Sequence, residues 1–334
     1  MQAAIYGLAG EALTADERAF FRGADPAGYI LFRRNIADLA QLKALTDDLR
    51  ALHGRDDLPI LIDQEGGRVA RMRPPVWPAF PSAWTFAALY SRAPMTAIQA
   101  ARTNAQAIAA MLREAGVNVD ALPLLDVRQE GADDIIGDRA LGAEPMQVAA
   151  LGRAVLDGLA AGGVVGIVKH MPGHGRSAVD SHKELPIVRA SEQELETDIA
   201  PFRTLRSAPM GMTSHVVYTA WDPEFPASHS SSVITDIVRG RIGFTGFLMS
   251  DDIGMHALSG SFRDRTALAL SAGCDAALHC SGKFEEMLEV AEGAGPLTEE
   301  GRARLDRAMA IAATPASVPY AELIEQRDAL IAAA

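Results

Sequence analysis

The chain has 334 residues, of which 49% are apolar, and its formal net charge is −12. A chain of this length can bury a large core, and it is near the upper limit for one domain unless that domain is a barrel. The negative charge argues against a nucleic-acid or anionic-membrane partner, because such partners require concentrated Lys and Arg. We therefore expect a small-molecule ligand.

Neither a secretion signal nor a membrane span is expected from the sequence. Met1 is followed by no basic segment with a long apolar stretch, and nowhere do eighteen apolar residues run uninterrupted. The two cysteines, Cys274 and Cys280, are too few for a disulfide framework. These features predict a cytoplasmic protein.

The first elements in chain order alternate between strand and helix. An apolar run at 3–8 predicts a strand, and Thr14 followed by Glu17 three residues later is a capping-box signature that predicts a helix start. A second apolar run at 28–32 precedes leucines at helical spacing from Asp38 onward. The chain thus begins with two strand–helix units.

The same alternation continues through most of the chain. Ser191 and Glu194 form a second capping box. Further strands are expected at 59–62, 117–125, 164–168, 211–214, 246–250 and 275–278. Helices are expected near 95–115, 145–161, 191–206, 232–240, 263–272 and 283–292. About eight short strands alternating with helices predict a parallel sheet covered on both faces.

Eight such units favour a (β/α)₈ TIM-type barrel, because no glycine-rich dinucleotide fingerprint follows the first strand. Two further helical stretches, 298–313 and 320–332, are expected to pack on the barrel, so that 1–334 form a single catalytic domain. Six of the eight apolar runs end in an ionisable residue. In a barrel these strand ends face one mouth, which predicts a shared pocket.

The segment 169–186 concentrates polar chemistry after a strand. It contains Lys169, His170, His174, Asp180 and His182. One interpretation is a metal site, although the prolines and glycines in KHMPGHG disfavour the helix that would place two histidines on one face. A second is a loop with structural histidines. A third is a proton-transfer dyad, because Asp180 and His182 share one side of an extended segment.

A second polar feature is the acid pair Asp251-Asp252 at the end of the 246–250 strand. By itself the pair has three interpretations: metal ligands, a solvated turn, or a nucleophile beside a structural carboxylate. The pair alone does not decide among them.

Four motifs together resemble a known family. They are DQEGGRV at 63–69, KHMPGHG at 169–175, DSHKE at 180–184 and SDD at 250–252. In this order they are similar to the β-N-acetylglucosaminidases of glycoside hydrolase family 3, specifically the single-domain cytoplasmic enzymes of peptidoglycan recycling. Met171 and the Ile253-Gly254 pair depart from the usual pattern, and neither change removes a catalytic group.

The resemblance implies a TIM barrel and a retaining mechanism through a covalent glycosyl-enzyme, with no metal and no cofactor. It implies Asp251 as nucleophile and His182 as general acid/base assisted by Asp180. It also implies that the non-reducing N-acetylglucosamine is bound by Asp63, Arg71, Arg139, Lys169 and His170. The expected substrate is a small carbohydrate, by resemblance a muropeptide carrying 1,6-anhydro-N-acetylmuramic acid.

The chemistry of these residues is compatible with those roles. An imidazole has an unperturbed pKa near 6.5, and a neighbouring Asp180 would raise it, so His182 could protonate a leaving group near neutral pH. Two alternatives remain open: a phosphorylase that uses phosphate as acceptor, and a non-catalytic sugar sensor. For Lys169 and Asp63 a buried ion pair is also possible, and Arg139 could be an ordinary surface arginine.

Overall fold

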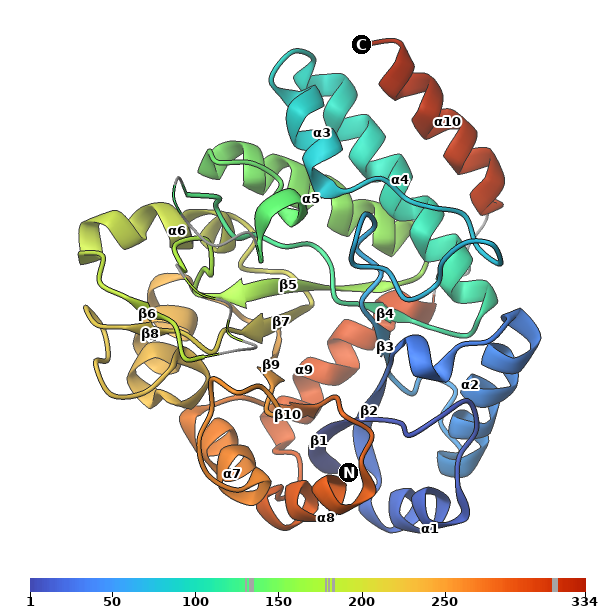
Figure 1. The fold of residues 1–334 in the computed structure, drawn as a ribbon, viewed down its shortest axis with the longest axis vertical. Coiled ribbons are helices and arrows are strands. Elements are labelled where there is room, and N and C mark those ends of the chain that lie inside the picture. The colour runs from blue at the N-terminus through green and yellow to red at the C-terminus, as the bar shows by residue number, and fades with distance from the viewer. Residues whose placement is uncertain (130, 132–134, 178, 180, 182–183, 314–317) are drawn as a thin grey trace.

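A computed structural model of the chain describes residues 1–334 except 130, 132–134, 178, 180, 182–183 and 314–317. Eight parallel strands close into a barrel in the order β1-β10-β9-β7-β5-β4-β3-β2 (Figure 1). They are β1 (Gln2–Gly7), β2 (Pro26–Leu31), β3 (Ile60–Ile62), β4 (Val119–Asp120), β5 (Val165–Met171), β7 (Met210–Thr213), β9 (Phe247–Asp252) and β10 (Ala276–His279). The expected α/β barrel is confirmed.

The strands are apolar on both faces because each face is covered. On β3, Leu61 points into the barrel and packs with residues such as Val119 and Val165. Its neighbours Ile60 and Ile62 belong instead to the larger apolar cluster between barrel and helices. This alternation is the period-2 geometry of a strand, and it explains continuous apolar runs in the sequence.

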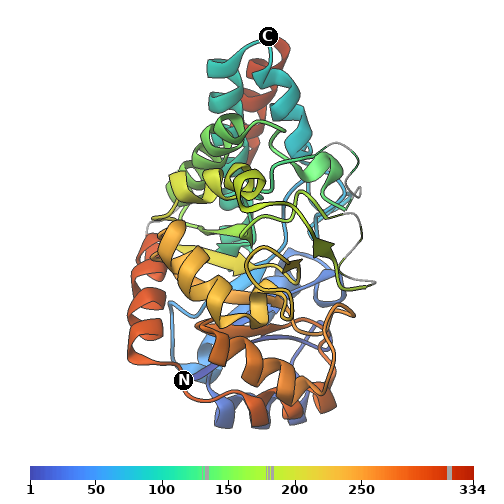
Figure 2. The ribbon, with the colours of Figure 1, turned by 90° about the vertical axis from the view of Figure 1, so that its left-hand side faces the viewer.

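Helices surround the barrel (Figures 1 and 2). Both capping boxes are confirmed: Thr14 caps the first helix with Glu17, and Ser191 caps α6 with Glu194. The α-helices are α1 (Ala15–Ala24), α2 (Leu39–His53), α3 (Ala83–Tyr90), α4 (Pro94–Glu114), α5 (Pro145–Ala161), α6 (Glu192–Thr204), α7 (Phe262–Ala272), α8 (Phe284–Gly293), α9 (Glu299–Met309) and α10 (Tyr320–Ala332). Shorter or irregular helices are η1 (Arg33–Asn35), η2 (Gly137–Arg139), η3 (Ala227–His229), the π-helix η4 (Val233–Arg241) and η5 (Ala310–Ala313).

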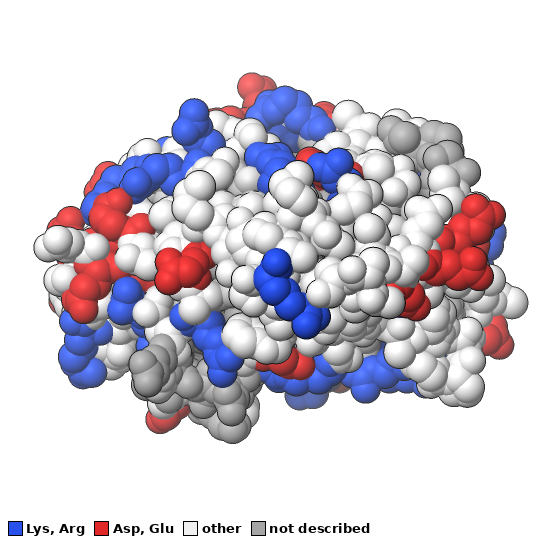
Figure 3. Space-filling model, turned by 90° about the horizontal axis from the view of Figure 1, so that it is seen from above, with Lys and Arg blue, Asp and Glu red and all other residues white. Residues whose placement is uncertain are grey.

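The last two helices contact different parts of the molecule. From α9, Leu305 and Met309 join the apolar cluster that fills the barrel. The final helix, α10, lies along α4, where Arg327 Nη1 donates to Asn104 Oδ1 at 3.0 Å. In the described part of the chain, none of the helices combines the length and the apolar character that a membrane span requires. Acidic and basic side chains are interspersed on the face shown in Figure 3.

Four local features differ from the sequence expectation. The strand expected at 117–125 is limited to Val119–Asp120. Strand β5 continues to Met171, so Lys169 and His170 lie on the strand and not in the loop after it. A lysine is tolerated there because carboxylates neutralise it, as described below. Helix α3 was not expected, and neither was the two-stranded sheet of β6 (Ile187–Val188) and β8 (Val217–Tyr218).

Candidate active site

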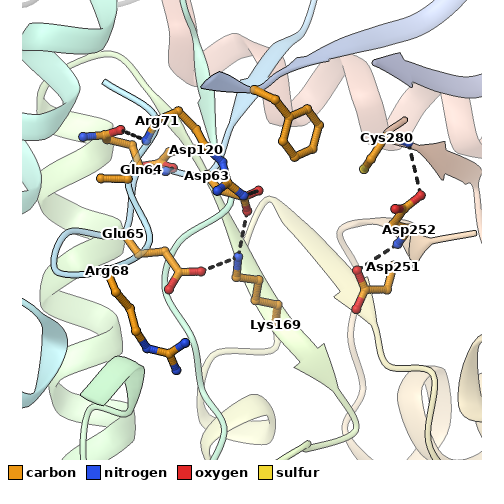
Figure 4. A network of polar contacts seen from close by, with 12 residues as sticks. Asp63, Gln64, Glu65, Arg68, Arg71, Asp120, Lys169, Asp251, Asp252 and Cys280 are labelled. Carbon is orange, nitrogen blue, oxygen red and sulfur yellow. Dashed lines mark hydrogen bonds and ion pairs between the residues drawn. The ribbon is translucent and has the colours of Figure 1, made fainter. Parts of the chain in front are cut away.

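One wall of the barrel mouth is a network of buried charges (Figure 4). Lys169 Nζ lies 3.1 Å from Asp63 Oδ1 and 2.8 Å from Glu65 Oε1. Each carboxylate also contacts an arginine: Arg71 Nη2 donates to Asp63 Oδ2 at 2.8 Å, and Arg139 donates to both oxygens of Glu65 at 2.8 Å. The side chain of Lys169 is only 2% exposed. One lysine therefore links two arginine–carboxylate pairs.

The cations keep both carboxylates ionised despite burial. Burial alone would raise the pKa of Glu65, but Arg139 and Lys169 together lower it to about 2. Burial opposes the charge of Asp63 in the same way, yet Lys169 and Arg71 hold its pKa well below the usual range. The Lys169 ammonium would lose its proton more easily on burial, but the two carboxylates raise its pKa. The network presents fixed charged acceptors and donors to a ligand.

A second group of buried polar residues is centred on Asp126. Its Oδ2 lies 2.7 Å from His170 Nδ1, and its Oδ1 accepts the backbone amides of His170 and His174. Burial alone would raise the pKa of Asp126, but His170 and these hydrogen bonds lower it to about 2. An ionised carboxylate can only accept, so His170 Nδ1 donates and its Nε2 is left for the pocket. Asp126 thus sets the orientation of a predicted sugar-binding residue.

The opposite wall carries the acid pair at the end of β9 (Figure 4). The backbone amide of Asp252 donates to Asp251 Oδ1 at 2.8 Å. The side chain of Asp252 accepts the amides of Gly254 at 2.9 Å and Cys280 at 3.1 Å through Oδ1. Burial raises the pKa of Asp252, and the charge of Asp251 acts in the same direction, whereas the hydrogen bond from the Gly254 amide opposes both. The two acids thus have different surroundings, and Asp252 is tied into the backbone.

Between the two walls is a cavity of about 270 Å³, close to the lower end of small-molecule sites. Its lining includes Asp63, Arg71, Arg139, Lys169, His170, Asp251 and Asp252. The structure therefore brings all five predicted sugar-binding residues and the predicted nucleophile to one pocket. The convergence of strand ends expected from the sequence is confirmed.

The other two predicted catalytic residues, Asp180 and His182, lie outside the described residues. Ser181 is described: it is buried, lines the cavity, and its Oγ lies 3.2 Å from Nε2 of His174. Burial, and secondarily His170, lowers the pKa of His174 to about 4, so its ring is neutral at pH 7. Among the residues that the structure describes, no three His, Cys, Asp or Glu side chains are placed to hold a metal ion.

Sequence reasoning missed Glu65 as a site residue, although a signal was present. Glu65 is two residues after Asp63, and residues at this spacing share a face of an extended segment. The chain then turns sharply at Gly66, whose φ is +90°. Two tryptophans follow β3 in the chain but are not among the described residues that line the cavity: Trp77 packs in the core, and Trp84 lies beneath the guanidinium of Arg128.

A charged, sugar-sized pocket at the carboxyl ends of barrel strands, with a strand-end carboxylate facing fixed polar groups, is compatible with a glycoside hydrolase of the (β/α)₈ class. Comparison with known proteins gives the family. The model of the glycosyl hydrolase family 3 N-terminal domain matches residues 10–310. The chain belongs to this family.

Relatives and solved structures agree with this assignment. A β-hexosaminidase of Bordetella avium is 40% identical over 279 residues, covering 82% of this chain and 79% of its own. A β-hexosaminidase of Aromatoleum aromaticum is 37% identical over 306 residues, covering 90% of this chain and 85% of its own. The crystal structure of native NagZ from Neisseria gonorrhoeae is 31% identical, covers 99% of this chain and 96% of its own, and has a TM-score of 0.85. The same protein was also solved with N-trifluoroacetyl-D-glucosamine.

Proposed function

We propose that this glycoside hydrolase, a β-N-acetylhexosaminidase, removes the non-reducing N-acetylglucosamine from peptidoglycan fragments by a retaining mechanism. The substrate class that we propose is the muropeptide carrying 1,6-anhydro-N-acetylmuramic acid, processed in the cytoplasm by 1–334 as one catalytic domain. The observation that carries the proposal is the pocket itself, in which a buried network of fixed charges faces the carboxylate of Asp251.

In this proposal the charged network binds the sugar hydroxyls. A hydroxyl both donates and accepts, so the ionised Asp63 can accept from it while Lys169 and Arg71 donate to it. Glu65 holds Arg139 through two hydrogen bonds and thereby fixes the guanidinium at the edge of the pocket. His170 offers its Nε2 toward the same cavity. These groups are held by one another, so little side-chain entropy is lost when the sugar binds.

The chemistry that we propose has two steps. Asp251 attacks the anomeric carbon as the bond to the leaving oxygen breaks, and His182, assisted by Asp180, protonates that oxygen. His182 then takes a proton from water, which attacks the anomeric carbon and releases Asp251 with net retention. The acid/base step is expected to contribute about 10²–10⁴ in rate.

The direct test is mass spectrometry of the protein, intact and after proteolysis, following incubation with a 5-fluoro N-acetylglucosaminyl fluoride. We expect one added glycosyl group on the peptide containing Asp251, and none on the Asp251→Ala variant, which should be nearly inactive. Asp236→Ala, at an exposed carboxylate on η4, is the matched control and should label as the wild type does. Wild-type turnover by Asp251→Ala would show that the nucleophile assignment is wrong.

The same assay separates the proposal from the two alternatives. A hydrolase releases N-acetylglucosamine whether or not phosphate is present, whereas a phosphorylase releases the 1-phosphate and is faster with phosphate. A sugar sensor would bind the sugar and cleave neither an aryl N-acetylglucosaminide nor a muropeptide.

A further inference from the structure

Residue 252, directly after the proposed nucleophile, is held from both neighbouring strands. On the β10 side, the Cys280 amide donates to the Asp252 carboxylate at 3.1 Å, and the Arg34 guanidinium donates to the Cys280 carbonyl. On the β7 side, Nε2 of His215 lies 2.9 Å from the Asp252 carbonyl oxygen. Strand β9 lies between these two strands. Asp252 is therefore held on two sides, through its carboxylate by the Cys280 amide and through its backbone carbonyl by His215.

The contacts of His215 determine its tautomer. A carbonyl oxygen only accepts hydrogen bonds, so Nε2 must carry the proton and donate it to Asp252. The other nitrogen, Nδ1, then accepts from the Ser228 hydroxyl, which is 2.7 Å away. The imidazole is fully buried, and burial lowers its pKa, so a neutral ring with this one tautomer is what the environment favours. His215 is a fixed single donor.

Asp252, which His215 holds, itself donates a hydrogen bond to the proposed nucleophile Asp251. The amide of Asp252 donates to Asp251 Oδ1 at 2.8 Å, so the position of residue 252 affects the position of that carboxylate. We propose that His215 is a positioning residue for catalysis: through the Asp252 backbone it holds the Asp251 carboxylate in line with the anomeric carbon. His215 is not among the described residues that line the cavity, so in this proposal it acts through Asp252 and not by touching the sugar.

This inference rests on the proposed role of Asp251. Misplacing a reacting group by about 1 Å can cost on the order of 10²-fold in rate. Because His215 acts on the nucleophile and not on the sugar-binding wall, its loss is expected in kcat and in the rate of glycosyl-enzyme formation, with KM little changed. Loss of a residue that only fills space would not lower kcat selectively while leaving KM unchanged.

The test compares three variants, and a fourth described below, with the wild type. His215→Phe keeps a planar ring and removes the donor, whereas His215→Gln restores an N–H near the position of Nε2. The matched control is His229→Phe: His229 is also buried, its ring centroid is 6.3 Å from that of His215, and its Nε2 has no hydrogen-bond partner among the residues that the structure describes. For each variant we would measure the melting temperature, kcat, KM and the rate of labelling by the 5-fluoro sugar.

We expect His215→Phe to lower kcat and the labelling rate by about 10- to 100-fold with KM within about threefold. His215→Gln should recover most of that loss, and His229→Phe should stay within about twofold of the wild type. Ser228→Ala, which leaves Nδ1 without its donor but keeps the ring, should give a several-fold loss and serves if His215→Phe does not fold.

Two results would overturn the inference while leaving the proposed function intact. One is that the wild type is labelled on Asp251 and that His215→Phe is labelled equally fast. If His215→Phe is unfolded, the same result with Ser228→Ala counts instead. The other is an equal loss in His215→Phe, His215→Gln and His229→Phe, which would assign the effect to packing. If the wild type is neither active nor labelled, the proposed function fails and the inference fails with it.

Discussion

Replacing Lys169 by methionine tests whether the charged wall of the pocket is held together by its central cation. The substitution keeps the length of the side chain and removes the charge that lies 3.1 Å from Asp63 and 2.8 Å from Glu65. Two buried carboxylates would then face each other, each with one arginine left. Removing one partner of a buried ion pair typically costs roughly 3–5 kcal/mol.

That free energy converts into a measurable melting temperature. Unfolding entropy is about 2.1 cal/mol/K per residue near 60 °C, which gives about 0.7 kcal/mol/K for 334 residues. Lys169→Met should therefore melt about 4–7 °C below the wild type in calorimetry at pH 7. The control is Lys283→Met: this lysine is 70% exposed and lies 2.9 Å from Glu286, and an exposed pair of this kind contributes only about 0–1 kcal/mol.

A double-mutant cycle distinguishes charge from packing. If the cost comes from the unpaired carboxylates, adding Glu65→Gln to Lys169→Met should cost less than Glu65→Gln alone, with a coupling free energy of roughly 0.5–3 kcal/mol. A melting temperature within 1 °C of the wild type for Lys169→Met, or strict additivity in the double variant, would refute the reasoning.

Three further predictions follow from individual residues. Burial among cations depresses the folded-state pKa of Glu65 to about 2, so its contribution to the free energy of unfolding is complete above the unfolded value near 4.5 and is lost as pH falls from about 4.5 to 2. In urea unfolding, the stability of the wild type should therefore fall by roughly 3 kcal/mol more than that of Glu65→Gln over this range. Parallel pH profiles of the two proteins would contradict this expectation. His182→Ala should lose about 10²–10⁴ in kcat on substrates with poor leaving groups and much less on activated aryl glycosides, whereas equal losses on both would count against a general acid. Gly175→Ala should destabilise the protein by about 1–3 kcal/mol, since the added Cβ would overlap the Val127 carbonyl. The control Gly10→Ala has open space at its Cβ and should melt near the wild-type temperature. Equal melting temperatures of the two variants would remove the packing explanation for Gly175.

The sequence by itself determined the alternation of the eight barrel strands with most of the helices, and the start of several helices. Capping boxes such as Thr14–Glu17 and Ser191–Glu194 are contacts over three residues, so local sequence is enough to specify them. Apolar runs ending in ionisable residues predicted a barrel with a polar mouth, because parallel strands place all their carboxyl ends on the same side. The predicted sugar-binding residues and Asp251 converge for that reason.

The tertiary structure alone decided how those residues pair. Glu65 meets Arg139 and Lys169 across 74 and 104 positions of chain, and no local pattern specifies such partners. The extension of β5 through Lys169 has the same origin, because a lysine can occupy a buried strand only where distant carboxylates neutralise it. The tautomer of His215 likewise follows from a carbonyl on one neighbouring strand and a hydroxyl on a later segment. Local sequence fixes secondary structure through short-range contacts, whereas charge pairing and proton positions depend on groups that only the folded barrel brings together.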